Sequence, residues 1–231
     1  FIHFGLTSQD INHVALTSSI KTSNIETILP SLHIIKNKLL EKSKLWNKIE
    51  ILGHTHGQPA SLTTMGKEWL VFHDRLEIQM KKLEKFEYST KFGGAVGNLR
   101  AHYCVYPNKN WKDFAKTFVE RFSLTLQENT TQIEHYDGLA ELFDLFCRIN
   151  TILIDFCRDI WLYVSMNYLS QKKKDDEVGS STMPHKVNPI NFENAEGNLQ
   201  LANNLFGFMA RKLPISRLQR DLTDSTVIRN I

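Results

Sequence analysis

The segment 179–189 gathers side chains that could carry out acid–base chemistry on an anionic substrate. It holds two serine hydroxyls, an imidazole, an ammonium and an amide, in Ser180, Ser181, His185, Lys186 and Asn188. One glycine and two prolines disfavour regular structure here, and the charged run 172–177 just before it is too polar to be buried. We therefore expect an exposed loop that closes over a substrate, with a plain solvated connection as the alternative.

A second candidate for proton transfer is the stretch His54-Thr55-His56-Gly57-Gln58-Pro59. Gly57 and Pro59 favour a turn that presents an imidazole, the side chain best able to give or take a proton near neutral pH. A His-x-His pair could also bind zinc, but no third ligand follows at a recognisable spacing. A hydrogen-bonded structural histidine is the other alternative.

Two segments could bind anions. Thr7 and Ser8 precede an amphipathic helix, so either can be its N-cap and the exposed amides can receive an anion, although capping alone would explain the pair. The second segment carries cations and a hydroxyl, in Arg217, Arg220, Ser225 and Arg229. Thr223 or Asp224 would cap a helix there that places Ser225 and Arg229 on one face, and solvated surface arginines are the alternative.

Two glycine-containing features predict close packing. The run Gly93-Gly94-Ala95-Val96-Gly97-Asn98 lacks the Walker and dinucleotide patterns, so we expect a tight turn and no phosphate cradle. Gly66 lies inside a helical pattern, where it costs about 1 kcal/mol relative to alanine, and so indicates close packing.

Long helices must position these residues. Between Gly138 and Gly179 there is no glycine or proline, and apolar residues recur at alternating spacings of three and four. The seam consists of Leu139, Leu142, Phe146, Ile149, Leu153, Phe156, Ile160 and Tyr163. At ~1.5 Å per residue it marks a helix of about 40 Å or more, which suits a bundle shared between subunits.

The same spacing predicts a second long helix from Leu62 to Phe86. Further helices are expected from about Gln9 to Lys48, bent near Pro30, from about Trp111 to Phe122 and from about Asn191 to Lys212, whereas strand signals are scarce. The predicted fold class is all-α, an elongated bundle of long helices that assembles into a multi-subunit helical core.

Composition excludes several classes of protein. The 231 residues are 42% hydrophobic and 23% charged, with a net charge of +3 and no basic patch, which argues against disorder and nucleic-acid binding. No long apolar run or signal peptide is present, so we expect no membrane contact. Cys104, Cys147 and Cys157 have no metal-like spacing and suit a reducing compartment, with the cytoplasm as default. The chain begins at Phe1 and stops just after a helix-start signal, so we expect a fragment of a longer protein.

Several motifs resemble those of one enzyme superfamily. Gly-Ser-Ser-x-Met-Pro-x-Lys-x-Asn-Pro, residues 179–189, resembles the signature loop of the fumarase/aspartase superfamily of lyases, which eliminate fumarate from succinyl-type substrates. Thr-Ser-x-Asp (7–10), Thr-His-Gly-Gln-Pro-Ala (55–60) and Arg-Asp-Leu-Thr-Asp-Ser-Thr (220–226) are similar to segments of its adenylosuccinate lyase branch. The resemblance extends over residues 1–231.

The resemblance implies a role for each candidate residue. Ser180 removes a proton from carbon, whereas the residues alone would make His185 the base. His56 protonates the departing nitrogen, and Lys186 with Asn188 stabilises the carbanion. Further substrate contacts are implied at Thr7, Ser8, Gln132, Ser181, Asn194, Arg220, Ser225, Thr226 and Arg229.

The same resemblance implies a substrate and an assembly. The reaction is elimination of fumarate from adenylosuccinate to give AMP, and from the succinylated carboxamide intermediate of purine synthesis, in a homotetramer with shared sites and with no cofactor or metal. Residues 1–231 would be the central helical domain, without the family's N-terminal and C-terminal domains, and the isolated fragment should show little turnover. The alternatives are an argininosuccinate lyase-like enzyme and a non-catalytic helical scaffold.

Overall fold

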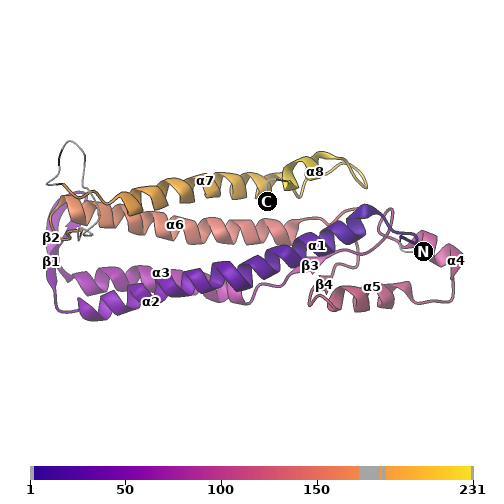
Figure 1. Cartoon of the computed structure of the whole chain (residues 1–231), viewed down its shortest axis with the longest axis horizontal. Coiled ribbons are helices and arrows are strands. Elements are labelled where there is room, and N and C mark those ends of the chain that lie inside the picture. Colours follow the sequence, from indigo (N-terminus) through magenta and orange to yellow (C-terminus); the bar gives the residue numbers. More distant parts are fainter. Residues whose placement is uncertain (1–2, 172–182, 184–185, 230–231) are drawn as a thin grey trace. The chain divides into compact units, whose positions relative to one another are not determined.

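The computed structural model describes residues 3–171, 183 and 186–229, and its secondary structure is mainly helical (Figure 1). The helices are α1 (Ser8–Ser23), the π-helix η1 (Asn24–Ile28), α2 (Leu29–Leu45), α3 (Met65–Glu84), α4 (Arg100–Val105), α5 (Trp111–Glu120), α6 (Asp137–Ser165), α7 (Ile190–Lys212) and α8 (Thr223–Ile228). The strands are β1 (Glu50–Thr55), β2 (Gln58–Thr64), β3 (Ser89–Thr90) and β4 (Thr125–Leu126). The predicted all-α class is therefore confirmed.

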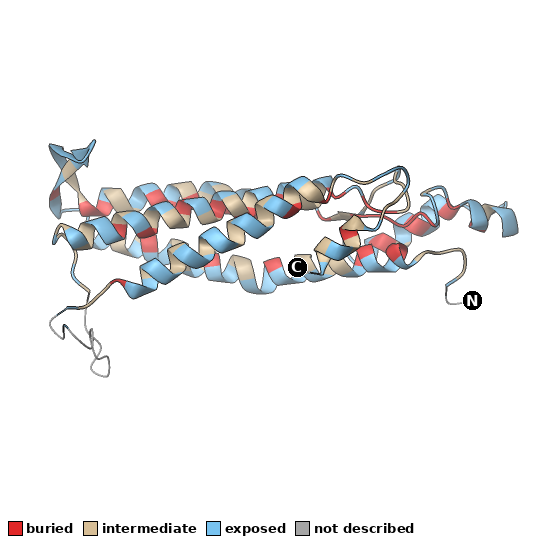
Figure 2. Cartoon of the chain, turned by 90° about the horizontal axis from the view of Figure 1, so that it is seen from above, coloured by how far each residue is buried: buried red, intermediate tan, exposed pale blue. Residues whose placement is uncertain are grey.

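The chain divides into two compact units. Unit 1 comprises Phe1–Leu32, Lys82–Asp144 and Phe206–Ile231, and unit 2 comprises His33–Lys81 and Leu145–Leu205. Each unit has its own buried apolar residues, and buried positions recur along the helices in Figure 2 with exposed positions between them.

Helix α6 follows the predicted seam. All eight seam positions from Leu139 to Tyr163 are buried or half-buried, and Leu142 is 0% exposed. The spacing of three and four residues places them on one face of the helix, so burial of that face favours helix over any other local structure. The predicted helices near 111–122 and 191–212 are confirmed as α5 and α7.

The helical stretch predicted from Gln9 to Lys48 is present but contains an irregular turn. Its irregularity is the π-helix η1, in which the Leu29 N–H donates to the Asn24 carbonyl, five residues back. Pro30 follows at once, and because proline has no N–H it cannot continue the α-helical ladder. The structure thus places the irregularity just before the expected bend.

The second predicted helix was wrong at its start. Leu62 lies in β2, where it is 70% exposed and pairs with Leu52 of β1, and α3 begins only at Met65. Main-chain pairing in the antiparallel β1–β2 hairpin outweighs a helical spacing that Leu62 matches by coincidence. Phe86 lies beyond the end of α3 and packs edge-on against Tyr88 at 5.0 Å.

Unit 2 is held together by close packing between α2, α3 and α6. The Trp69 ring makes edge contacts with Trp46 and Phe156, each at a centroid distance of 5.0 Å. A Cβ added to Gly66 would lie 2.3 Å from the Ser43 carbonyl oxygen, so only glycine fits at this crossing. The prediction of close packing at Gly66 is confirmed.

Candidate active site

The predicted site residues fall in both units, and each unit is described separately. Unit 1 holds Thr7, Ser8, Gln132, Arg220, Ser225, Thr226 and Arg229. Unit 2 holds His56, Lys186, Asn188 and Asn194. Ser180, Ser181 and the alternative base His185 lie outside the described residues.

Arg220 is the centre of a hydrogen-bonded cluster in unit 1. Its Nη1 donates to Gln132 Oε1 at 3.1 Å, its Nη2 donates to Ser225 Oγ at 3.0 Å, and its Nε donates to a main-chain carbonyl. The Gln9 amide satisfies its neighbours when its oxygen faces Arg220, where it accepts from Nη1 at 3.1 Å and from Nη2 at 2.8 Å. These four partners are neutral acceptors, so they orient the guanidinium without cancelling its charge.

Arg217, unlike Arg220, has a charged hydrogen-bond partner. Its Nη1 lies 3.1 Å from Asp221 Oδ2 in an exposed ion pair, so its charge already has a partner. The Asp221 carboxylate also accepts from the N–H of Thr223, the first residue of α8, at 2.9 Å. The predicted cap at Thr223 or Asp224 was wrong, because Leu222 is the N-cap residue and both candidates lie within α8. Asp224 is buried and accepts a hydrogen bond from the Tyr136 hydroxyl at 3.0 Å.

The remaining candidates of this segment lie on or directly after α8. Ser225 is half-buried against Arg220, whereas Thr226 and Arg229 are exposed. Arg229 is the C-cap residue of α8, four positions after Ser225. The structure therefore brings Gln132, Arg220 and Ser225 into direct contact and leaves Arg229 at the surface.

Thr7 is the N-cap of α1, as predicted. Its N–H donates to Asp10 Oδ2 at 2.8 Å, and its hydroxyl donates to the same oxygen at 3.3 Å. Ser8 follows as the exposed first residue of the helix, where main-chain N–H groups point out of the helix end. An anion at this end would meet the Ser8 hydroxyl and main-chain donors.

The run 93–98 is a turn, as predicted, and its amides hold an internal carboxylate. The N–H groups of Gly93 and Gly94 donate to Asp10 Oδ1 at 2.8 and 3.0 Å. Gly97 has a φ of +80°, and a Cβ there would lie 1.9 Å from the Thr130 carbonyl oxygen. Consecutive amides of this kind form an anion-binding concavity, which Asp10 fills.

His13 connects this region to the Arg220 cluster. Its Nε2 accepts from the Glu134 N–H at 3.3 Å and faces the Gln9 amide nitrogen at 3.3 Å. Burial, together with the positive charge of Lys91, lowers the His13 pKa to about 4. The imidazole is therefore neutral at pH 7, with its proton on Nδ1.

Several buried titratable residues were missed by sequence reasoning. They are Asp10, His13, Lys91, Glu134 and Asp224. Only Asp10 has a local signal, since it stands three residues after the N-cap as in a capping box. The others have partners far away in sequence, 121 residues for His13 and Glu134, so no short pattern reveals them.

In unit 2, His56 lies at the tip of the β1–β2 hairpin. His56 and Gly57 form the two-residue loop, with φ of +54° and +72°, and the His56 side chain is exposed. The expected turn that presents an imidazole is confirmed. His54 is different, because its Nδ1 lies 3.0 Å from the Leu52 carbonyl oxygen and its ring packs near Tyr168.

The other candidates of unit 2 lie before and within α7. The N–H of Lys186 donates to the Met183 carbonyl at 3.1 Å, and the Lys186 side chain is exposed. Asn188 is half-buried, its carbonyl accepts from the N–H of Ile190, and Asn194 is exposed in the first turns of α7.

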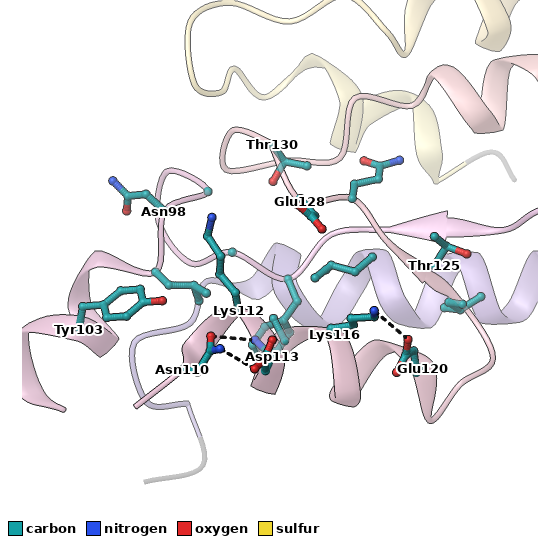
Figure 3. A pocket seen from close by; sticks show the side chains of 18 of the residues that line it. Asn98, Tyr103, Asn110, Lys112, Asp113, Lys116, Glu120, Thr125, Glu128 and Thr130 are labelled. Carbon is teal, nitrogen blue, oxygen red and sulfur yellow. Dashed lines mark hydrogen bonds and ion pairs between the residues drawn. The ribbon is translucent and has the colours of Figure 1, made fainter. Parts of the chain in front are cut away.

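A cavity of about 600 Å³ in unit 1 contains none of the predicted site residues (Figure 3). It lies beside α5 and β4, and its charged groups are mixed in sign, with Lys112 and Glu128 among them. Two more of its charges belong to the Lys116–Glu120 ion pair at 3.9 Å. This mixture does not select an anion, and we assign the cavity no ligand.

Comparisons with known proteins agree on one family. The sequence model of the lyase family matches residues 1–205. Adenylosuccinate lyase of Dictyostelium discoideum is 57% identical over 235 residues, covering 100% of this chain and 50% of that protein. Adenylosuccinate lyase of Escherichia coli strain K12 is 48% identical over 231 residues, covering 100% of this chain and 51% of that protein.

One solved structure agrees on the fold. The crystal structure of 3-carboxy-cis,cis-muconate lactonizing enzyme from Pseudomonas putida matches with a TM-score of 0.78 and 23% identity, covering 99% of this chain and 49% of that one. The chain spans about half the length of the curated relatives it matches.

Proposed function

Because the chain belongs to the lyase family, we propose that its protein eliminates fumarate from adenylosuccinate to give AMP, and from the succinylated carboxamide intermediate of purine synthesis. The observation that carries the proposal is the match of the whole chain, at 57% identity, to a curated adenylosuccinate lyase. Residues 1–231 would form the central helical domain of this enzyme.

The proposed chemistry is an acid–base elimination. Ser180 takes the proton from the succinyl Cβ, and the electron pair left on carbon forms the double bond of fumarate. The C–N bond breaks, its electrons pass to nitrogen, and His56 supplies the proton that completes AMP. Lys186 and Asn188 stabilise the negative charge that builds up on the substrate carboxylate. A serine hydroxyl ionises far above neutral pH, so nearby donors must stabilise its alkoxide.

The Arg220 cluster supports binding of an anionic group. All its direct partners described above are neutral, and a phosphate or carboxylate oxygen that replaced one of them would form a stronger, charge-assisted bond. In this proposal the substrate is held by Thr7, Ser8, Gln132, Ser181, Asn194, Arg220, Ser225, Thr226 and Arg229.

We further propose a homotetramer with shared sites in the cytoplasm. The proposed acid His56 is exposed on its own chain, as expected for a residue that helps to complete a site with other subunits. Helix α7 exposes Leu201, Leu205 and Phe208 by 60, 46 and 50%, and their spacing places them on one face.

None of the described helices is long and apolar enough to cross a membrane, and the three cysteines form no disulfide.

A turnover assay tests the proposed function. The full-length protein should release fumarate from adenylosuccinate and not from argininosuccinate, whereas residues 1–231 alone should show little turnover. Ser180→Ala and His56→Ala should each lower kcat by about 10²-fold or more. His54→Ala is the matched control and should retain most of the activity, because within the described part of the chain its ring contacts its own hairpin and Tyr168.

The alternatives give different results. Turnover of argininosuccinate would favour an argininosuccinate lyase-like enzyme. Absence of turnover on both substrates, in a full-length protein that folds and assembles, would favour the non-catalytic scaffold.

A further inference from the structure

Asp10 has an unusually complete set of hydrogen-bond donors. Its Oδ1 accepts from Lys91 Nζ at 2.7 Å and from the N–H groups of Gly93 and Gly94. Its Oδ2 accepts from the N–H and the hydroxyl of Thr7. The two carboxylate oxygens therefore hold two different segments, the glycine turn and the start of α1.

The ion pair between Asp10 and Lys91 is fully buried. Both side chains are 0% exposed, and Lys91 Nζ also lies 3.4 Å from the Gly94 carbonyl oxygen. Taking two charges out of water costs nearly as much as their attraction returns, so a well-packed apolar pair would stabilise the fold equally well. What the ion pair supplies in addition is directional geometry.

That geometry closes a ring of contacts through unit 1. Asp10 binds the glycine turn, and the turn's Ala95 carbonyl accepts from Gln132 Nε2 at 2.9 Å. Gln132 accepts from Arg220, and Arg220 donates to Gln9, the neighbour of Asp10 on α1. The start of α1 and the Arg220 cluster are thus fixed to each other along two routes, one direct and one through the turn.

We propose that Asp10 and Lys91 are positioning residues that set the spacing between Thr7–Ser8 and the Arg220 cluster. The inference rests on the proposed function, in which both groups bind anionic parts of one substrate. A substrate with two anionic groups gains from both sites only when their spacing matches its own, and a displacement of about 1 Å is enough to lose much of that gain. Neither Asp10 nor Lys91 contacts the substrate in this scheme.

The test is the double variant Asp10→Asn/Lys91→Met. The change Asp10→Asn keeps one oxygen for the glycine amides but turns an NH₂ group toward the Thr7 N–H, which releases the start of α1. The change Lys91→Met fills the volume of the lysine side chain without leaving an unpaired buried ammonium. The control is Asp155→Asn/Arg75→Met, which removes an exposed ion pair of 2.6 Å from unit 2.

We expect the double variant to fold and to show a KM for adenylosuccinate raised about tenfold or more, with kcat changed much less. Hydrogen–deuterium exchange should become faster at residues 7–10 and 93–98. The control variant should leave KM and both exchange rates unchanged.

The outcomes separate this inference from the proposed function. A full-length wild-type protein without turnover refutes the proposed function, and the exchange experiment still tests the positioning role of the ion pair. A folded double variant with wild-type KM and wild-type exchange overturns the inference. If the double variant does not fold, Asp10→Glu, which displaces the carboxylate by one methylene, is measured in the same way. Failure of both variants to fold also overturns it, since the pair would then be needed for the fold itself.

Discussion

Lowering the pH from 7.5 to 5.0 should destabilise this protein through one buried imidazole, that of His13. The His13 side chain is 2% exposed, and its Nε2 accepts the hydrogen bond from Glu134 only while the ring nitrogen carries no proton. Burial is the largest cause that lowers its pKa from 6.5 to about 4. The positive charges of Lys91 and Arg220 act in the same direction, and Asp224 and Asp10 oppose them.

Proton linkage gives the direction and the size of this change in the free energy of unfolding. Between pH 6.5 and 4 the unfolded chain binds a proton on His13 that the folded chain does not bind, so the free energy of unfolding rises with pH in this window. The contribution is fully present above pH 6.5 and is lost as the pH falls toward 4. The pKa difference between the unfolded chain, 6.5, and the folded chain, about 4, contributes about 3 kcal/mol to the free energy of unfolding, and about 2 kcal/mol of this is lost by pH 5.

The assay is urea unfolding, followed by circular dichroism, of wild type and His13→Gln at both pH values. From pH 7.5 to pH 5.0, the free energy of unfolding should fall by about 2 kcal/mol more in wild type than in His13→Gln. Glu134, whose pKa burial raises, acts with the opposite sign in both proteins, so their difference reports on His13. His3→Gln, at an exposed position, should behave as wild type. Equal losses in wild type and His13→Gln would refute the argument that burial keeps this imidazole neutral.

Three further predictions concern ligand binding, packing and assembly. Arg220→Met should raise KM for adenylosuccinate about 10-fold or more, whereas Arg217→Met, which removes an arginine already paired with a carboxylate, should leave it nearly unchanged; equal effects would contradict the assignment. Gly97→Ala should lower the free energy of unfolding by about 3 kcal/mol, since it adds a clash to a left-handed backbone. Gly57→Ala should lower it by only about 1 kcal/mol, because its φ is similar but no atom of the described residues lies within 4 Å of the added Cβ; urea unfolding measures both. Leu205→Glu should shift the sedimenting species to a smaller size while Leu205→Met does not, and an unchanged assembly would rule out α7 as an interface.

The helices could be predicted because their signal is local. In α6 the apolar residues recur every three or four positions, and that spacing alone defines the buried face. The hairpin could not be predicted in the same way. Its second strand is exposed at its first five positions, so it lacks the alternation of buried and exposed residues by which strands are recognised. The hairpin is formed by main-chain hydrogen bonds, and these do not require particular types of side chain.

Single residues of the candidate site could be predicted where they belong to a short motif. The side chains that hold those residues in place could not be predicted, because they lie far away in sequence. Arg220 and Gln132 were predicted separately, but their hydrogen bond joins positions 88 apart. The Asp10–Lys91 ion pair could not be predicted, since a lysine near two glycines is typical of a solvent-exposed turn. Only the folded chain shows that this ammonium is buried.

The hairpin tip sets a limit on how far this protein could be stabilised by design. Two-residue loops with positive φ at both positions favour asparagine followed by glycine, and His56 occupies the asparagine position at φ +54°. A screen for thermal stability would therefore select His56→Asn, and under the proposed mechanism the selected variant would have lost its acid. Under that mechanism stability and turnover compete at this one position, so a thermostable variant of this protein that keeps its turnover has to gain its stability elsewhere.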